Sequence, residues 1–390
     1  MDGAAGWPLS EKNNKTCLEL AKTPNLDTMV HEGRIGLART VPPGMEPGSA
    51  VGCMSVLGYD PVVFYRGRSA IEAKSLNIPI SAGEVVFRCN LVAVKDGKML
   101  SSNAGSITTT EAKQLIEAID RELGSDSVHF YPGVNYRHIL KIKGHEEALR
   151  AVCTPPHDIA NQPVAGRLPN GPGSGLLLDL MKRSEAILKN HPVNRVRIAR
   201  GEIPATSIWL FWSSGQIPEM PGFKKTYGVK AAMTSAVDLL RGLAIMADMT
   251  ILEITGVTDS LDNDFAGQAT GALESLHEHD LVVIHIEAPD EAGHAGSADD
   301  KVKAIEKIDS EIISRILSFE EDKLRVLVMP DHPTPIKIRT HNDEPVPFLL
   351  WGHGISPNGG KRFTEKEAKY AEILIDKGFN LMNHLVKNIP

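Results

Sequence analysis

Two short segments combine carboxylate and imidazole side chains at the ends of apolar runs. The segment PDEAGHAG places Asp290 and His294 four positions apart, directly after the apolar run LVVIHIEA. A second apolar run, LRVLVMP, ends directly before Asp331 and His332. Carboxylate oxygens and neutral imidazole nitrogens together suit Mn²⁺, Zn²⁺ or Mg²⁺-like ions. A chain with 14 His and 49 acidic residues contains some such pairs by chance. Whether these two pairs could bind a metal therefore depends on the secondary structure that positions them.

Strand-like and helical patterns alternate in the second half of the chain. They predict strands over 207–212, 281–288, 324–330 and 346–352, and helices over 235–249 and 298–319. This alternation is typical of an α/β fold with a mostly parallel sheet and helices on both faces. Ligands of such sheets gather beyond the carboxyl ends of the strands, where Asp290 and Asp331 would lie. His341 opens the loop before the last strand, and Asp290 and His294 would share a face if their segment is helical.

The first half of the chain lacks this alternation. Its patterns predict a helix over 23–33, a strand over 34–41, a Gly/Pro-punctuated loop around a short apolar segment over 42–61, a strand over 85–95, a helix over 109–123, a hairpin over 127–144 and a helix over 171–191. A chain of 390 residues also exceeds the size at which a single core stops growing. We therefore expect an α+β domain of residues 59–221, inserted into an α/β domain of residues 1–58 and 222–390.

Composition excludes several classes of protein. A net charge of −7 without a Lys/Arg run argues against a nucleic-acid partner. The 4 cysteines have no CxxC spacing, which argues against a zinc knuckle or disulfide framework and favours a reducing compartment. No apolar stretch approaches about 18 residues and the N-terminus lacks a signal-peptide pattern, so we expect a cytoplasmic protein that does not contact membranes. The sequence does not indicate the oligomeric state.

Ser49 is the candidate nucleophile. It lies in PGMEPGSAVG, where Gly48 and other small residues let a phosphate or metal approach the backbone. A serine that opens a helix also meets a dipole favourable to phosphate. A loop serine that merely caps a helix has the same pattern. No G-x-S-x-G elbow surrounds Ser49, which disfavours acyl transfer.

Several segments match a known family in their order and spacing. They are MDG at 1–3, PGS at 47–49, GYDP at 58–61, DEAGH at 290–294, PDHPTP at 330–335 and HNDEPVPF at 341–348, with GRSAIEA, FRCNL, GVNYRH and TPPHD between them. In these segments the chain resembles the cofactor-independent phosphoglycerate mutases of archaeal type, members of the alkaline phosphatase superfamily. The match spans nearly the whole chain. A close branch, proposed as homoserine kinases, has similar PATSIWL and SAVDLL segments.

The resemblance implies an alkaline phosphatase-like domain that binds metal and an inserted phosphotransferase domain that binds substrate. It implies that 3-phosphoglycerate and 2-phosphoglycerate interconvert through a phosphoserine at Ser49, without 2,3-bisphosphoglycerate. Two divalent ions are implied, Mn²⁺ before Mg²⁺, Co²⁺ or Zn²⁺, one held by Asp2, Ser49, Asp331 and His332 and the other by Asp290, His294 and His341. Paired metals can stabilise attacking and leaving oxygens and lower the pKa of the serine hydroxyl. Closure of the domains on the substrate would exclude water.

A phosphorylated small-molecule substrate with three negative charges needs fixed cations. The matching segments offer Arg68, Arg88, Arg137, His138, His157 and Lys230, and Asp158 could orient the substrate hydroxyls. Surface salt bridges, or a turn cap in the case of Asp158, explain the same residues.

The chain departs from the family pattern at several positions. The family usually has an acidic residue at the position of Ala50, Asn or His at Cys53, and His at Ser106. Its first aspartate also follows a central β-strand, whereas only Met1 precedes Asp2 here. Because a missing strand would leave backbone groups unpaired, we expect the full protein to carry roughly eight further apolar residues. A native mass equal to the 42.3 kDa of this chain, with full activity, would refute that expectation.

Three other interpretations stay open. The chain could be a homoserine kinase-like phosphotransferase, although it has no G-x-x-x-x-G-K-[ST] loop. It could be a metal-dependent phosphatase, since the same centre hydrolyses esters when water is admitted. The short start and Ala50 also fit a catalytically silent relative that only binds metal.

Overall fold

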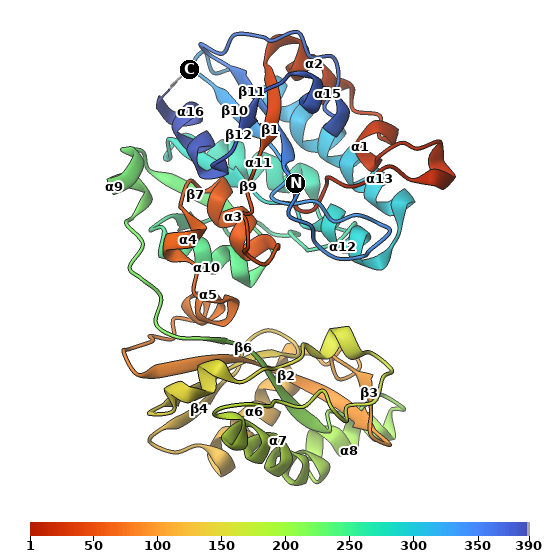
Figure 1. Cartoon of the computed structure of the whole chain (residues 1–390), viewed down its shortest axis with the longest axis vertical. Helices are drawn as coiled ribbons and strands as arrows, with labels where there is room; N and C mark the ends of the chain where they lie inside the picture. The colour runs from red at the N-terminus through yellow and green to blue at the C-terminus, as the bar shows by residue number, and fades with distance from the viewer. Residues whose placement is uncertain (388–390) are drawn as a thin grey trace. The chain divides into compact units, whose positions relative to one another are not determined.

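The structure is a computed structural model that describes residues 1–387, and the chain in it forms two compact units (Figure 1). Unit 1 contains residues 1–65 and the chain from Glu219 onward, and unit 2 contains residues 66–218. The chain therefore passes between the units at 65/66 and 218/219, where the sequence led us to expect 58/59 and 221/222. The roles expected for the two domains stay predictions.

One sheet of unit 1 has the strand order β10-β11-β1-β12, formed by Arg325–Val328, Val346–Gly352, Arg34–Ala38 and Leu374–Ile375. Strand β11 is antiparallel to both neighbours, and β12 is parallel to β1. Successive residues of β11 point to opposite faces. Phe348 and Leu350 pack on one face beside Leu381 of α16 (Leu381–Lys387), and Leu349 packs on the other, beside α2 (Pro24–Glu32) and α13 (Ala298–Lys307).

The other sheet of unit 1 is parallel and has the order β8-β7-β9. Its strands are Thr250–Ile251, Ala231–Thr234 and Leu281–Ile284, and helices α10 (Asp238–Met246) and α11 (Phe265–Ser275) pack against them. The predicted α/β class is confirmed. The strands that we expected in one mostly parallel sheet lie in three sheets. Residues 207–212 belong to the antiparallel sheet of unit 2, β9 belongs to the parallel sheet, and β10 pairs antiparallel with β11.

A cavity of about 660 Å³ lies between β9 and β10. Its lining includes the apolar side chains of residues 281–284 and 324–329. Within residues 1–387, no strand pairs with the edge of β9 or β10 that borders the cavity. Beyond the two strand ends, the amide of Asp2 donates to the Ile286 carbonyl at 2.8 Å, and the amino group of Met1 donates to the Met329 carbonyl at 3.4 Å.

Unit 2 is an antiparallel sheet with helices on both faces. Its strands are β2 (Glu84–Lys95), β3 (Lys98–Ser101), β4 (Val128–Tyr131), β5 (Arg137–Lys143) and β6 (Ser207–Ser214), in the order β3-β2-β5-β4 with β6 paired to β2. Helices α6 (Thr109–Leu123) and α7 (Ser174–Lys189) pack on one face, and α5 (Arg68–Ser75) packs on the other (Figure 1). The helix predicted over 109–123 and the hairpin predicted over 127–144 are present.

The loop predicted over 42–61 was wrong in its middle. Residues Ser49–Val56 form helix α3. Glycine and proline surround this segment, and Gly52 together with serine, valine and cysteine gives it a weak helix propensity, but nearly all its side chains are buried. Burial therefore stabilises a short helix that local propensity would leave marginal.

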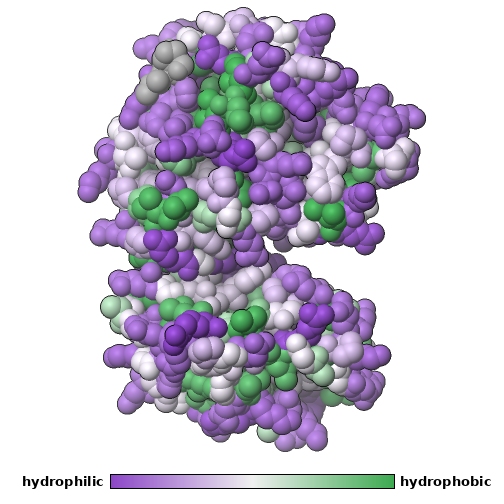
Figure 2. Space-filling view, viewed as in Figure 1, coloured by the Kyte–Doolittle hydropathy of each residue, from purple (hydrophilic) through white to green (hydrophobic). Residues whose placement is uncertain are grey.

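Apolar side chains on the face drawn in Figure 2 lie in small separate groups among polar ones. Isolated apolar residues of this kind are normal for a surface in water. No helix within residues 1–387 has the length and apolar character needed to cross a membrane.

Candidate metal centre

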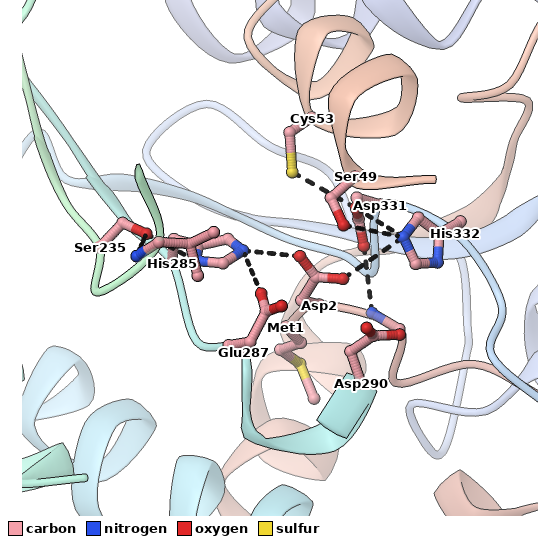
Figure 3. Close-up of polar contacts among 12 residues, drawn as sticks. Met1, Asp2, Ser49, Cys53, Ser235, His285, Glu287, Asp290, Asp331 and His332 are labelled. Carbon is pink, nitrogen blue, oxygen red and sulfur yellow. Dashed lines mark hydrogen bonds and ion pairs between the residues drawn. The ribbon is translucent and has the colours of Figure 1, made fainter. Parts of the chain in front are cut away.

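Side chains from four distant segments converge in unit 1 (Figure 3). Asp2 follows the first residue, Ser49 begins α3, and Asp331 and His332 follow β10. Asp290 lies on the helix α12 (Ala288–Ala295), which follows β9. Ser49 and Asp290 lie at the starts of helices, and Asp331 and His332 follow a strand, so the fold fixes these side chains closely.

One group of donors consists of Asp290, His294 and His341. Asp290 and His294 share a face of α12, as the spacing predicted, and His294 Nε2 lies 3.0 Å from Asp290 Oδ2. His341 Nε2 lies 3.7 Å from the same oxygen. Burial alone would raise the pKa of Asp290, but the two imidazoles hold it well below its ordinary value. Burial opposes the charged form of His294, yet Asp290 raises its pKa to about 9.

A second group surrounds the hydroxyl of Ser49. Its Oγ lies 3.2 Å from His332 Nε2, and that nitrogen lies 3.2 Å from Asp331 Oδ2 and 3.4 Å from Asp2 Oδ1. The amide of Gly3 donates to Asp331 Oδ1 at 3.1 Å and fixes that carboxylate. The structure thus brings the predicted nucleophile together with three of its predicted metal ligands.

Hydrogen bonds to Nδ1 orient the imidazoles of both groups. Nδ1 of His294 lies 3.0 Å from the Arg339 carbonyl, and Nδ1 of His332 lies 3.3 Å from Thr334 Oγ1. Thr334 Oγ1 in turn donates to Asp290 Oδ1. With Nδ1 occupied in this way, Nε2 of each ring faces the carboxylates, which is the usual arrangement of a metal-ligating histidine.

Two glycines make room for the carboxylates. A Cβ on Gly3 would lie 2.2 Å from Asp290 Oδ1, and its φ of +55° lies in the left-handed region. A Cβ on Gly52 would lie 2.5 Å from the Asp331 carbonyl. Larger residues at either position would displace the donors.

The carboxylates of the centre repel one another in the absence of a cation. Burial raises the pKa of Asp2 well above its ordinary value, and the nearby Asp331 and Asp290 add to this rise. Burial also raises the pKa of Glu287, with Asp2 adding to the effect. Asp2 Oδ1 and Glu287 Oε2 are buried without a hydrogen-bond partner. Buried carboxylates of this kind are normally paired or bound to metal.

The donors fit divalent cations. In three groups the potential ligand atoms all lie within 4.8 Å of one another: Asp290, His294 and His341; Asp2, Asp290 and His332; and Asp2, Cys53 and His285. Oxygen and imidazole donors suit Mn²⁺, Mg²⁺, Co²⁺ or Zn²⁺.

Sequence reasoning missed several residues of the centre. His285 and Glu287 were not among the candidates, although they lie in the run that leads to Asp290. Two charged residues at the end of an apolar strand were the available signal. Thr334 lay in a matching segment, but a threonine between two prolines gives no hint of its role until its contacts are known.

Several basic side chains of unit 2 lie around the Trp212 ring. The Arg68 guanidinium carbon lies 4.6 Å from the Trp212 ring centroid and that of Arg88 lies 6.0 Å away, while the His157 ring lies at 5.6 Å. Trp212 has a φ of +51°, unusual for a bulky residue, and lies where the pairing of β6 with β2 is irregular. Glu72 pairs with both arginines and balances part of their charge.

Arg137 and His138 adjoin this site through the pairing of β5 with β2. They lie opposite Asn90 and Cys89, next to Arg88. Burial, with Arg88 adding to it, lowers the pKa of His138 to about 3, so its ring is neutral at ordinary pH. We call Arg68, Arg88, Arg137, His138 and His157 the basic cluster.

Other predicted residues lie elsewhere. Lys230 is exposed and directly precedes β7, at the opposite end of the parallel sheet from the metal ligands. Asp158 is exposed beside His157, with 3.7 Å between carboxylate and ring. Ser106 is exposed in unit 2, whereas Ala50 is buried in α3. The structure therefore does not bring Lys230 to the metal ligands of unit 1.

Comparison with known proteins identifies the class. The family model for 2,3-bisphosphoglycerate-independent phosphoglycerate mutase matches residues 31–194. A 2,3-bisphosphoglycerate-independent phosphoglycerate mutase from Methanosarcina acetivorans is 42% identical over 99% of this chain and 98% of its own length. The corresponding protein from Methanosarcina barkeri is 43% identical with the same coverage. A probable enzyme of this name from Geobacter sulfurreducens is 42% identical, again over 99% and 98% of the two chains.

Solved structures have a similar fold. A Pyrococcus horikoshii protein aligns over 100% of this chain and 96% of its own, with a TM-score of 0.82 and 25% identity. A cofactor-independent phosphoglycerate mutase from Thermoplasma acidophilum aligns over 100% and 97%, with a TM-score of 0.64 and 24% identity. The fold and the site define a mixed α/β protein with a cluster of potential metal ligands. The chain belongs to the family of 2,3-bisphosphoglycerate-independent phosphoglycerate mutases.

Proposed function

We propose that this protein interconverts 3-phosphoglycerate and 2-phosphoglycerate through a phosphoserine formed on Ser49. The relatives that match over their full length bear the name of this activity. The main observation behind this proposal is the position of the Ser49 hydroxyl, whose oxygen lies 3.2 Å from His332. The hydroxyl also lies beside buried carboxylates whose negative charges neighbouring side chains do not fully balance. No 2,3-bisphosphoglycerate is required in this proposal.

The proposed transfer has two balanced steps. Ser49 Oγ loses its proton to solvent or a neighbouring group and forms a bond to phosphorus, while the bond between phosphorus and the C3 oxygen breaks and the C3 oxygen takes up a proton. The C2 hydroxyl then loses its proton and attacks the phosphorus of the phosphoserine, the bond between phosphorus and Ser49 Oγ breaks, and Ser49 Oγ takes up a proton. Two divalent ions, Mn²⁺ by preference, would supply the positive charge that favours ionised Ser49 and stabilises the phosphoryl oxygens.

Residues of the chain would hold and orient the reacting groups. Asp2, Asp331, His332 and Ser49 would hold one ion, and Asp290, His294 and His341 the other. Ser49 is also the first residue of α3, whose N-terminal amides and dipole favour a phosphoryl group. The arginines of the basic cluster would bind the carboxylate and phosphate of the substrate, since guanidinium forks match both groups.

The proposal also assigns the two units. Unit 1 would be the alkaline phosphatase-like domain that binds metal, and unit 2 the inserted phosphotransferase domain. The cysteines at 17, 53, 89 and 153 are free thiols in the structure, which supports a reducing location such as the cytoplasm.

Incubation with Mn²⁺ and 3-phosphoglycerate tests the proposal directly. Formation of 2-phosphoglycerate supports it, whereas release of free phosphate indicates a phosphatase, and no change indicates a silent relative. A separate incubation with ATP and homoserine tests the kinase alternative. Ser49→Ala should abolish the transfer, and Ser55→Ala on the same helix serves as a matched control. Retained mutase activity in Ser49→Ala would rule out the phosphoserine route.

A further inference from the structure

Asp2, Cys53 and His285 form a donor group that the two-ion arrangement of the proposed function does not use. Asp2 Oδ2 lies 2.7 Å from His285 Nε2 (Figure 3). The thiol of Cys53 completes the group, in which the potential ligand atoms lie within 4.8 Å of one another. All three residues are buried.

His285 is oriented like the other imidazoles of the centre. Its Nδ1 lies 3.0 Å from Ser235 Oγ, and Ser235 Oγ also accepts from the Val237 amide at 3.0 Å. Ser235 therefore holds the ring through its Nδ1 atom. The Nε2 atom points toward Asp2 and lies 3.5 Å from Glu287 Oε2.

Two further observations indicate that this group has room and need for a cation. Glu287 Oε2, which lies 3.5 Å from His285 Nε2, is buried without a hydrogen-bond partner. The same three donors line the cavity of about 660 Å³ between β9 and β10.

We propose that Asp2, Cys53 and His285 form a third cation site, which prefers Zn²⁺ or Co²⁺ to Mn²⁺ or Mg²⁺. A carboxylate, an imidazole and a thiol are a typical donor set for zinc, whereas Mn²⁺ and Mg²⁺ favour oxygen donors. Binding would release the thiol proton to solvent. The site adjoins the two-ion centre of the proposed function, on which this inference builds, because Asp2 belongs to both.

Titration of the full chain with Co²⁺ tests the site through its spectrum. A cobalt–thiolate bond gives a near-ultraviolet charge-transfer band, which we expect in the wild-type protein and not in Cys53→Ser. Cys153→Ser in unit 2 is the matched control and should keep the band. His285→Gln should weaken Co²⁺ binding at this site by about tenfold or more. Absence of the band from cobalt-loaded wild type, or its persistence in Cys53→Ser, would overturn the proposal.

A second measurement guards against misfolded variants. Cys53→His replaces the thiolate with an imidazole nitrogen ligand, so it should bind as many Zn²⁺ ions as the wild type by elemental analysis while losing the cobalt band. Cys53→Ser should bind one Zn²⁺ fewer. Equal zinc content in wild type and Cys53→Ser would contradict the third site. The Mn²⁺ mutase assay reports on the proposed function separately, so either idea can fail alone.

Discussion

The two units concentrate side chains of opposite charge. The centre of unit 1 gathers the carboxylates of Asp2, Asp290, Asp331 and Glu287, with imidazoles beside them. The basic cluster of unit 2 gathers arginines against Trp212, with Glu72 as the acidic partner that the structure places between two of them. Unit 1 therefore favours cations, and unit 2 favours anions.

This difference explains how one chain could bind metal in unit 1 and substrate in unit 2. Carboxylates in a buried site cost free energy unless a cation balances them. Guanidinium groups that stack on an aromatic ring keep their charge and can bind a carboxylate or phosphate by paired hydrogen bonds. Substitutions in one unit should thus change metal content, and substitutions in the other should change substrate affinity.

The largest effect is expected for Asp290→Asn. Asp290 belongs to two of the potential ligand groups, so the change should remove bound metal and lower kcat by about 1,000-fold or more. Elemental analysis and mutase kinetics measure both quantities. Asp299→Asn, an exposed surface change, is the control. Full metal content in Asp290→Asn would contradict the assignment of metal binding to the carboxylates of unit 1.

Arg68→Lys should weaken the binding of substrate by unit 2. A lysine cannot make the planar contacts of a guanidinium with Trp212 and with a bidentate anion, so KM should rise by about tenfold, or roughly 1.4 kcal/mol. Metal content should not change. Arg183→Lys, on the exposed side of α7, is the matched control. A loss of metal in Arg68→Lys would contradict the separation of roles.

Removal of metal by a chelator should loosen unit 1 alone. A ligand at 100 times its dissociation constant stabilises the state that binds it by about 2.7 kcal/mol, and chelation removes this contribution. Hydrogen exchange should become faster in α12 and around residues 331–341, while β2, β5 and β6 keep their protection. Equal acceleration in both units would show that the metal is not confined to unit 1.

A strand supplied ahead of Met1 should stabilise unit 1. Six to eight alternating apolar residues fused there could pair with the open edges of β9 and β10 and fill the cavity between them, so Tm should rise by roughly 2–4 °C or more. A Gly/Ser extension of equal length is the control. Identical melting temperatures for the two extensions would show that the cavity does not accept a strand.

The smallest effect concerns pH and unit 2. The folded state holds the pKa of His138 at about 3, below its unfolded value, so the unfolded state binds more protons as pH falls below about 6.5. His138 should therefore cost stability progressively between about pH 6.5 and 3, by about 0.8 kcal/mol at pH 6. Urea unfolding of wild type and His138→Asn, which keeps an acceptor for the Gly133 amide, measures this. His129→Asn is an exposed control, and parallel pH profiles for all three proteins would contradict the assignment.

Sequence reasoning performed best where the signal was local. The Asp290 and His294 pair lies on one helical face because the spacing of four dictates it. The helix over 109–123 follows from its apolar period and its Thr108 cap, which accepts from the Glu111 amide. The middle of 42–61 was misjudged because α3 depends on burial rather than on propensity.

Non-local contacts set the limit of prediction in the site. The contact of Thr334 with His332 could be expected from neighbouring positions, but its contact with Asp290 joins segments 44 residues apart. His285 became a candidate ligand only when its distance from Asp2, which is 283 positions away, was known. No pattern along the chain contains such distances.

By itself, the sequence determined the residue types that can bind divalent cations and anions, the α/β class, and the family to which the chain belongs. The tertiary structure decided that Asp2, Ser49, Asp290 and Asp331 share one buried volume, that Lys230 lies apart from it, and that Cys53 and His285 offer a further donor group. The physical reason is that side-chain chemistry is a property of each residue. Proximity, burial and the repulsion that calls for a cation arise only when distant segments pack together.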